Sequence, residues 1–161
     1  MSIVLFRVDE RLIHGQVVVG WAERLHIQRI LVVDDQLRES DWEQELYRLG
    51  VPNAMQAEFL SVDEARAAYP RWKEGGERLV LLVRDIPTLE RLADGGLLNG
   101  QEVNLGGIHS GPGRTRVLPY LFLDEGERAA LRRIQEGGAV VTARDLPASR
   151  MVGLGELVDG H

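Results

Sequence analysis

The 161-residue sequence predicts an α/β fold, a three-layer sandwich in which helices cover both faces of a mostly parallel central sheet. Short runs of branched apolar residues alternate with amphipathic segments at the spacing of βα units, which is the pattern of such a sheet. The length fits one domain, and neither an internal repeat nor a long linker divides the chain. We therefore expect a single domain over residues 1–161, with a loose, glycine-rich end after about residue 150.

Composition narrows the functions open to the chain. Its 44% hydrophobic and 27% charged residues are those of an ordinary globular protein. The absence of cysteine excludes disulfides and thiolate metal sites and fits a cytoplasmic protein. The net charge of -6 disfavours nucleic acid as a partner, because such binding needs a basic face. No apolar run approaches the roughly 20 residues of a membrane span.

Capping residues and apolar runs place the elements of the first half. Ser40 precedes an amphipathic run and Gly50 follows it, so these two residues mark the ends of a helix. Ser61-Val62-Asp63-Glu64 has the capping-box pattern, and Pro70 ends or kinks the helix that begins there. The predicted strands are 2–8, 29–33 and 55–60, and the predicted helices are 16–26, 40–49 and 62–69.

The helix predicted over 40–49 carries three large apolar residues on one face, at i, i+4, i+7 spacing. They are Trp42, Leu46 and Leu49. Exposed apolar residues on one of the predicted helices could form a dimer face. Periodicity does not distinguish such a face from one packed on the core, so the sequence leaves a homo-oligomer open.

Glycine and proline mark the element boundaries of the second half. Pro87 suits the first turn of a helix. Gly106-Gly107 inside a strand indicates that another backbone or a ligand comes close. Asp124-Glu125-Gly126-Glu127 places acids at the start of the last helix, which suits the helix dipole. The predicted strands are 78–83, 102–108, 117–123 and 139–143, the helices are 87–94 and 124–135, and a loop covers 109–115.

The turn between the first strand and the first helix is crowded with charged side chains. It reads Arg7-Val8-Asp9-Glu10-Arg11-Leu12-Ile13-His14-Gly15-Gln16-Val17. In an open α/β sheet such a turn lies at the carboxyl end of a strand, where ligands usually bind. The free amides at a helix start can bind an anion there.

His14 can act as a nucleophile as well as a base, because a neutral imidazole has a free ring nitrogen near pH 7. A phosphoryl group on it would need hydrogen-bond donors, which Arg7, Arg11 and the amides after Gly15 can supply. Asp9 could orient the ring by accepting its other N–H. The simpler interpretation is an ordinary loop histidine beside a surface Asp9–Arg11 ion pair.

This run resembles the active-site motif of the IIB component of the sugar phosphotransferase system, mannose/fructose/sorbose family. Further matches follow at Val32-Val33-Asp34-Asp35, at Val103-Asn104-Leu105-Gly106-Gly107 and from Gly138 to Pro147, so the resemblance covers nearly the whole chain. It implies a single IIB domain with an α/β sheet between helices. It also implies a protein-N(π)-phosphohistidine–sugar phosphotransferase that needs neither a cofactor nor a metal.

The resemblance implies that His14 accepts a phosphoryl group on Nδ1 from a phosphohistidine of a IIA partner. The group then passes to a sugar that IIC and IID partners carry through the membrane, so the protein would lie in the cytoplasm at the inner membrane face. The other motif residues fall on Arg7, Asp9, Arg11, Gly15 and Gln16. We expect Arg11 to clamp the phosphate and Asp9 to orient the ring. The amides of Gly15 and Gln16 would lend backbone donors.

Two stretches depart from the family's pattern. Arg38 follows Asp34-Asp35 in a region where smaller residues are expected, and it could reshape the rim of the pocket. The loop over 109–116, which contains His109 and two arginines, is longer and more basic than expected. It could contact the phosphate or a partner, although a Gly-Pro-Gly turn with solvated arginines is the simpler interpretation.

Other functions remain open on the sequence alone. Phosphorylation of His14 could gate binding to a regulatory partner without any sugar being modified. His14 could also be a general base acting on an anionic metabolite. His14 and His109 could share a metal only if the fold brings them together. A nucleotide-binding glycine motif is absent.

Overall fold

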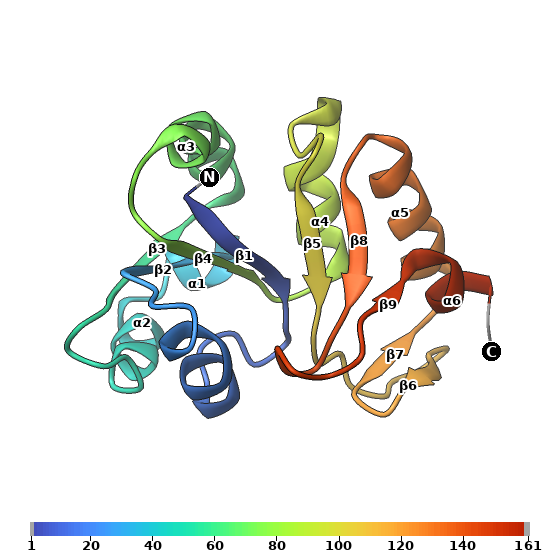
Figure 1. Ribbon diagram of the computed structural model, residues 1–161, viewed down its shortest axis with the longest axis horizontal. Helices are drawn as coiled ribbons and strands as arrows, with labels where there is room; N and C mark the ends of the chain where they lie inside the picture. The colour runs from blue at the N-terminus through green and yellow to red at the C-terminus, as the bar shows by residue number, and fades with distance from the viewer. Residues whose placement is uncertain (1, 160–161) are drawn as a thin grey trace.

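The computed structural model describes residues 2–159, so residues 1, 160 and 161 of the predicted domain lie outside the described part. A seven-stranded sheet has the order β3-β2-β4-β1-β5-β8-β9, and β6 and β7 form a separate hairpin (Figure 1). All neighbours in the large sheet are parallel except β8 and β9. The strands are β1 (Ile3–Val8), β2 (Arg29–Val33), β3 (Gln56–Leu60), β4 (Leu79–Val83), β5 (Glu102–Leu105), β6 (Thr115–Leu118), β7 (Leu121–Leu123), β8 (Val140–Ala143) and β9 (Val152–Gly153).

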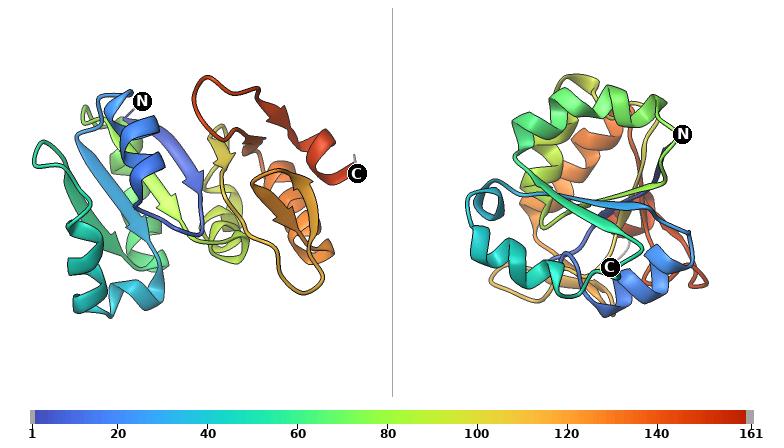
Figure 2. Two further views of the ribbon diagram at one scale, coloured as in Figure 1. Left: turned by 90° about the horizontal axis from the view of Figure 1, so that it is seen from below. Right: turned by 90° about the vertical axis from the view of Figure 1, so that its left-hand side faces the viewer.

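Helices cover both faces of the large sheet, which confirms the predicted three-layer α/β fold. The helices α3, α4 and α5 lie on one face, and η1 and α2 lie on the other (Figure 2). Within residues 2–159 no helix is both long and apolar enough to cross a membrane. The helices are η1 (Gln16–Glu23), α1 (Asp35–Arg38), α2 (Asp41–Arg48), α3 (Val62–Glu74), α4 (Ile86–Ala93), η2 (Asp94–Gly96), α5 (Glu125–Glu136) and α6 (Leu154–Asp159).

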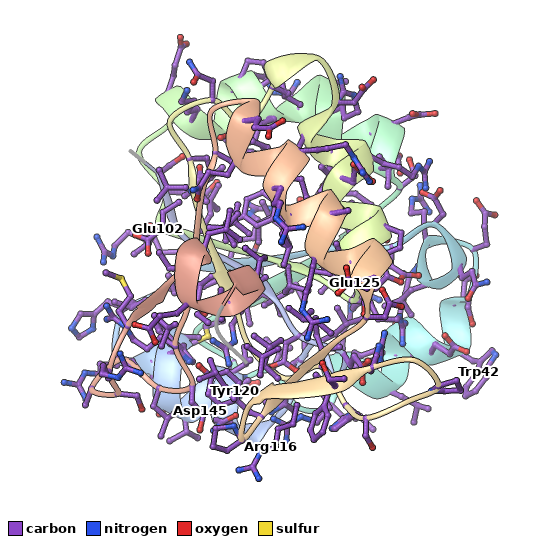
Figure 3. The ribbon with its side chains drawn as sticks, turned by 90° about the vertical axis from the view of Figure 1, so that its right-hand side faces the viewer. Trp42, Glu102, Arg116, Tyr120, Glu125 and Asp145 are labelled. Carbon is purple, nitrogen blue, oxygen red and sulfur yellow. The ribbon has the colours of Figure 1, made fainter. Side chains whose placement is uncertain are left out.

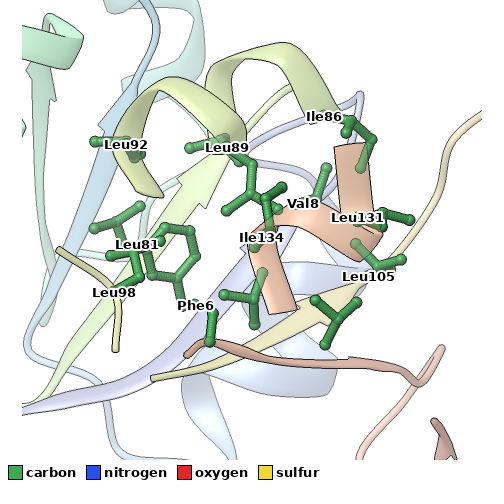
Figure 4. Packing of buried hydrophobic residues seen from close by; sticks show 14 of the residues in the cluster. Phe6, Val8, Leu81, Ile86, Leu89, Leu92, Leu98, Leu105, Leu131 and Ile134 are labelled. Atoms are coloured by element: carbon green, nitrogen blue, oxygen red, sulfur yellow. The ribbon is translucent and has the colours of Figure 1, made fainter. Parts of the chain in front are cut away.

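Two apolar cores form because successive side chains of a strand point to opposite faces of the sheet. Phe6 and Val8 of β1 join the core beneath α3, α4 and α5 (Figure 4). Leu5, from the same strand, joins the core beneath η1. In β4, Leu81 and Leu82 are divided between the two cores in the same way. The central strand β4 is therefore apolar along its whole length, as a strand buried on both faces is.

The turn after β1 is fixed by backbone hydrogen bonds to the ends of the two neighbouring strands. The amide of Asp9 donates to the carbonyl of Val83, which ends β4, at 2.9 Å. On the other side, the amide of Glu10 donates to the carbonyl of Gly107, just after β5, at 2.9 Å. The carboxyl ends of three strands thus meet at this turn, the usual place for a site in an open α/β sheet.

Two predicted elements have different limits in the structure. The helix expected to end or kink at Pro70 continues through it to Glu74. The proline removes only one hydrogen bond, and Tyr69 beside it is buried and donates from its hydroxyl to Gln101 at 2.9 Å. The single strand predicted over 117–123 is wrong, because the chain turns at Pro119-Tyr120 and β6 pairs antiparallel with β7.

The apolar face of α2 points to solvent, so packing of this face against the core is not observed. Trp42 is 67%, Leu46 57% and Leu49 84% exposed. The side of α2 that faces inward carries Gln44, whose amide donates at 3.0 Å to the carbonyls of Leu37 and Arg38 at the end of α1. The sequence does not predict α1, and the docking of α2 onto it determines which face is exposed.

The end of the chain differs from the loose tail that the sequence predicts. Val152 and Gly153 pair antiparallel with β8 as strand β9. The helix α6 follows directly, and its Leu157 is completely buried against the larger core. Burial of three apolar side chains, Val152, Leu154 and Leu157, accounts for this order despite the glycines.

Candidate functional site

His14 lies between β1 and η1, at the carboxyl edge of the sheet. Its carbonyl accepts a hydrogen bond from the amide of Val18 at 3.0 Å, so its backbone already takes part in the first turn of η1. The ring is mostly covered, with 13% of the side chain exposed. Nε2 is buried 3.2 Å from Oδ2 of Asp9, although the alignment is too poor for a hydrogen bond. The ring is therefore held with Nε2 inward against a carboxylate.

Asp9 is the fully buried carboxylate beneath the ring. One oxygen, Oδ1, accepts the amide of Arg11 at 3.1 Å. The other, Oδ2, lies 3.4 Å from both Nη2 of Arg7 and the amide of Gly107. Burial by itself raises the pKa of Asp9, but the contact with His14, the charge of Arg7 and the Arg11 amide together lower it below its usual value. Asp9 is thus a buried anion beside the imidazole, and its role as the orienting residue stays a prediction.

Arg7 is completely buried below the turn, with its donors directed into the protein. Nη1 donates to the side chain of Asn104 and, at 2.8 Å, to the carbonyl of Arg144. Nη2 donates to the carbonyl of Asp145 at 3.2 Å. Burial lowers the pKa of Arg7, whereas the charges of Asp9 and Asp145 raise it. The structure therefore gives Arg7 a supporting position under Asp9 rather than the direct phosphate contact that the sequence predicts.

Two neighbours shape the buried position of Arg7. The guanidinium lies over the ring of Trp21, 5.1 Å from its centroid, which is a cation–π distance. On the other side it packs against Gly106, where an added Cβ would lie only 2.4 Å from the guanidinium carbon. The glycine predicted to mark a close approach in β5 therefore makes room for this side chain.

Arg11 is the motif arginine that reaches solvent, with 48% of its side chain exposed. Its Nε lies 3.7 Å from Oδ1 of Asp9, and its Nη2 donates to Oε1 of Gln16 at 3.1 Å. Gln16 in turn donates from Nε2 to Oδ1 of Asp145 at 3.2 Å. An added Cβ on Gly15 would meet nothing within 4 Å, so the space above the start of η1 is open. This open space lies at the start of η1, and backbone amides at a helix start and an exposed guanidinium are both groups that bind anions.

The loop over 109–116 is tied to the motif through Glu10. Nδ1 of His109 lies 2.6 Å from Oε2 of Glu10, and Nη1 of Arg114 donates to Oε1 at 3.0 Å. Arg114 also makes a bidentate pair with Glu127 in the first turn of α5, at 3.1 and 3.0 Å. Arg114 is therefore not the solvated arginine of the simpler interpretation, since it connects the rim of the site to the start of α5.

Other sequence predictions for this region turn out differently. Nε of Arg38 donates to Oε1 of Glu64, in the first turn of α3, at 2.8 Å. The positive charge of Arg38 is thus paired with this carboxylate. Among residues 2–159, no cluster of three or more histidine, aspartate or glutamate side chains is arranged to hold a metal ion. Nδ1 of His109 contacts Glu10, and this is one of the contacts described above that tie the 109–116 loop to the motif.

The structure brings together most of the residues predicted for the site, and it adds three that motif reasoning missed. His14, Asp9, Arg11 and Gln16 form one connected group that runs from the buried Asp9 to the half-exposed Arg11. The missed residues are Asn104, Asp145 and Trp21, which hold Arg7 or Gln16 from β5, from the turn after β8 and from η1. Asn104 and Asp145 lie in stretches that match the family's pattern, so the sequence match could have pointed to these two residues.

The chain matches known proteins along nearly all of its length. The family model for the PTS system sorbose subfamily IIB component matches residues 3–160. The PTS system mannose-specific EIIAB component of Escherichia coli strain K12 is 31% identical over 162 residues, covering 99% of this chain but only 50% of that protein. The PTS system sorbose-specific EIIB component of Lacticaseibacillus casei is 30% identical over 89% of this chain and 87% of its own length.

Solved structures share the fold. The IIBSor domain of the sorbose permease from Klebsiella pneumoniae superposes with a TM-score of 0.86 at 26% identity, covering 100% of this chain and 99% of that one. The N-acetylgalactosamine-specific IIB component 1 from Escherichia coli gives a TM-score of 0.84 at 26% identity, covering 93% and 97%. The order of helices and strands around His14 is therefore one already seen in crystals.

Proposed function

The chain belongs to the sorbose subfamily of IIB components of the phosphotransferase system, and from that premise we propose that it carries a phosphoryl group to a sugar on His14. The observation that carries this proposal is the placement of the ring. Nε2 is buried against the carboxylate of Asp9, so the other ring nitrogen, Nδ1, is the one left for chemistry. A carboxylate on Nε2 favours the tautomer in which Nε2 carries the proton and Nδ1 keeps its lone pair.

The phosphoryl group on Nδ1 would be held by charge and by main-chain donors. Arg11 is the half-exposed guanidinium next to the ring, and the amides at the start of η1 are open above Gly15. A helix start contributes about 0.3–1 kcal/mol to an exposed anion. One arginine and a few amides would bind the phosphoryl group only moderately tightly. Moderate binding suits a relay, because phosphoryl transfer depends mainly on positioning and charge and the group has to leave again.

Two displacements at phosphorus complete the relay. First, the Nδ1 lone pair attacks the phosphorus of a phosphohistidine on a IIA donor; the donor P–N bond breaks and its electron pair returns to the donor imidazole. Second, a sugar hydroxyl oxygen attacks phosphorus, and the P–N bond on His14 breaks with its pair returning to Nδ1. The hydroxyl proton passes to a base at the IIC and IID membrane subunits, which present the sugar. The protein would work in the cytoplasm at the membrane face.

Labelling tests the proposal. With phosphoenolpyruvate, the general phosphotransferase proteins and IIA, we expect acid-labile phosphate on the protein and none on His14→Ala. His109→Ala is the matched control and should label as the wild type does, because its ring contacts Glu10 at the rim. Equal labelling of His14→Ala would refute the assignment.

A second stage separates sugar transport from a regulatory role. Membranes containing IIC and IID, together with sugar, should discharge the label from the wild-type protein and yield sugar phosphate. Label that stays on the protein under these conditions would favour a phosphorylation-gated interaction module. Turnover of an anionic metabolite without any labelled intermediate would favour a general base at His14.

A further inference from the structure

We infer that Asp145 is a positioning residue for the Arg11 guanidinium and acts on it through the side-chain amide of Gln16. This inference rests on the proposed function, because Arg11 matters only if an anion binds beside His14. None of the three side chains forms part of the apolar cores, and they come from three segments. Arg11 is in the turn after β1, Gln16 begins η1, and Asp145 lies in the turn after β8.

The contacts form a continuous chain from the turn after β8 to the guanidinium. Oδ1 of Asp145 accepts from Nε2 of Gln16 at 3.2 Å, and Oε1 of Gln16 accepts from Nη2 of Arg11 at 3.1 Å. At its other end the Arg11 side chain lies near Asp9, with Nε 3.7 Å from Oδ1. The guanidinium is therefore placed from two sides, by Asp9 and by the amide of Gln16.

The direction of this chain follows from the chemistry of a carboxylate. An ionised Asp145 can only accept hydrogen bonds, so it binds the NH₂ end of the Gln16 amide. That leaves Oε1 of Gln16 turned towards Arg11, which can only donate. A neutral amide at position 145 could accept or donate, and the Gln16 amide could then turn its NH₂ group towards Arg11. Two donors facing one another would displace the guanidinium from the space above η1.

The carboxylate of Asp145 can be changed without changing the structural role of its backbone. The main-chain carbonyl of Asp145 accepts from Nε1 of Trp21 at 3.0 Å and from Nη2 of Arg7 at 3.2 Å. Those two bonds fix the turn after β8 and do not involve the carboxylate. The Asp145 side chain lies at the edge of the molecule near Tyr120 (Figure 3), and burial together with the charge of Asp145 raises the pKa of that tyrosine.

Positioning matters for Arg11 because nearly half of its side chain is in solvent. A free arginine samples many rotamers, and ordering it when phosphate arrives would oppose binding. A guanidinium already held by Gln16 and Asp9 loses less freedom at that moment. Asp145 is thus expected to affect the rate of phosphorylation without contacting the phosphoryl group.

Asp145→Asn tests this in the full chain. Phosphoramidate, a small phosphoryl donor, is used so that no partner protein enters the measurement. The rate constant for phosphorylation of His14 should fall by roughly 3- to 10-fold, the effect of one ordinary hydrogen bond. The melting temperature should fall only slightly, and by less than for Asp9→Asn, because the Trp21 and Arg7 bonds are to the backbone and only the weaker charge interaction of Asp145 with Arg7 is lost. Asp94→Asn is the matched control; it changes an exposed aspartate at the far end of α4 and should leave the rate constant unaltered.

A double-mutant cycle with Arg11→Met distinguishes a positioning role from general damage. If Asp145 acts through Arg11, Asp145→Asn should change the rate by less than about twofold once Arg11 is absent. An equal reduction in both backgrounds, or a wild-type rate for Asp145→Asn alone, would overturn the inference. Failure of the proposed function has a different signature, since His14→Ala would then take label from phosphoramidate as fast as the wild type.

Discussion

Asp9→Asn is expected to destabilise the folded protein by about 3–5 kcal/mol, because it leaves the buried guanidinium of Arg7 without its partner charge. Both side chains of this pair are 0% exposed, and Nη2 of Arg7 lies 3.4 Å from Oδ2 of Asp9. Water cannot replace the lost charge at such a depth. The substitution also removes the anion that holds Nε2 of His14, so phosphorylation of the ring should slow as well. Urea unfolding and labelling of the same preparation measure the two effects.

Acid unfolding gives an independent readout of the same group. The folded protein holds the pKa of Asp9 below its usual value, because the contact with His14, the charge of Arg7 and the Arg11 amide outweigh burial. The stabilisation from Asp9 is therefore present above the unfolded pKa and is lost as the pH falls through the lower, folded value. The stability of Asp9→Asn should therefore show no loss from this group as the pH falls through that range.

Asp34→Asn is the matched control. Its partner Arg84 is 35% exposed, and asparagine still caps α1, so a loss of about 1 kcal/mol or less is expected. Equal losses for the two variants would contradict this account of Asp9.

Gly106→Ala is expected to cost about 3 kcal/mol of folding free energy and most of the phosphorylation rate. The new methyl group would lie 2.4 Å from the guanidinium carbon of Arg7, and Trp21 on the other side leaves that side chain little room to move. Displacing Arg7 would disturb its bonds to Asn104 and to the turn after β8, and with them the support of Asp9. Overpacking alone typically costs about 1–3 kcal/mol, and lost bonds to a charged group add to it.

The neighbouring glycine supplies the control. At Gly107 an added Cβ would be no nearer than 3.6 Å to Asp9, an ordinary van der Waals distance, so Gly107→Ala should cost about 1 kcal/mol or less. Shortening the displaced side chain should relieve the clash, so Gly106→Ala combined with Arg7→Met should be more stable than the sum of the two single losses. If the two losses of stability were strictly additive, the effect of Gly106→Ala would not come from a clash with the Arg7 side chain.

Much of the fold could be predicted because its signals are local. The predicted capping box at Ser61 is present, and Asp124 caps the start of α5 at the acidic stretch predicted there, with each side chain accepting the amide three residues on. Apolar runs such as β2 and β4 keep their predicted places, because a strand buried on both faces needs branched residues along its whole length. The motif after β1 likewise lies at the sheet edge where a turn of that kind was expected.

The remaining features depend on contacts between distant segments. The exposure of Leu46 is determined by α1, a four-residue helix with too few residues to show a periodic pattern. The supporting position of Arg7 depends on Asn104 and on carbonyls from the turn after β8, more than 95 residues away in sequence. An arginine in an active-site motif is predicted to bind the ligand, and only the fold shows that both terminal nitrogens of Arg7 donate inside the protein. The order of residues 152–159 depends in the same way on the pairing of β9 with β8.

The most direct test of the whole account is the position of phosphorus on the protein. Long-range proton–nitrogen NMR spectra of the phosphorylated, ring-labelled protein identify both the histidine and the ring nitrogen that carries the group. We expect a single phosphohistidine, at Nδ1 of His14, with Nε2 protonated and facing Asp9. Phosphorus on Nε2 of His14, or on His109 or another residue, would contradict the arrangement from which every other prediction is derived.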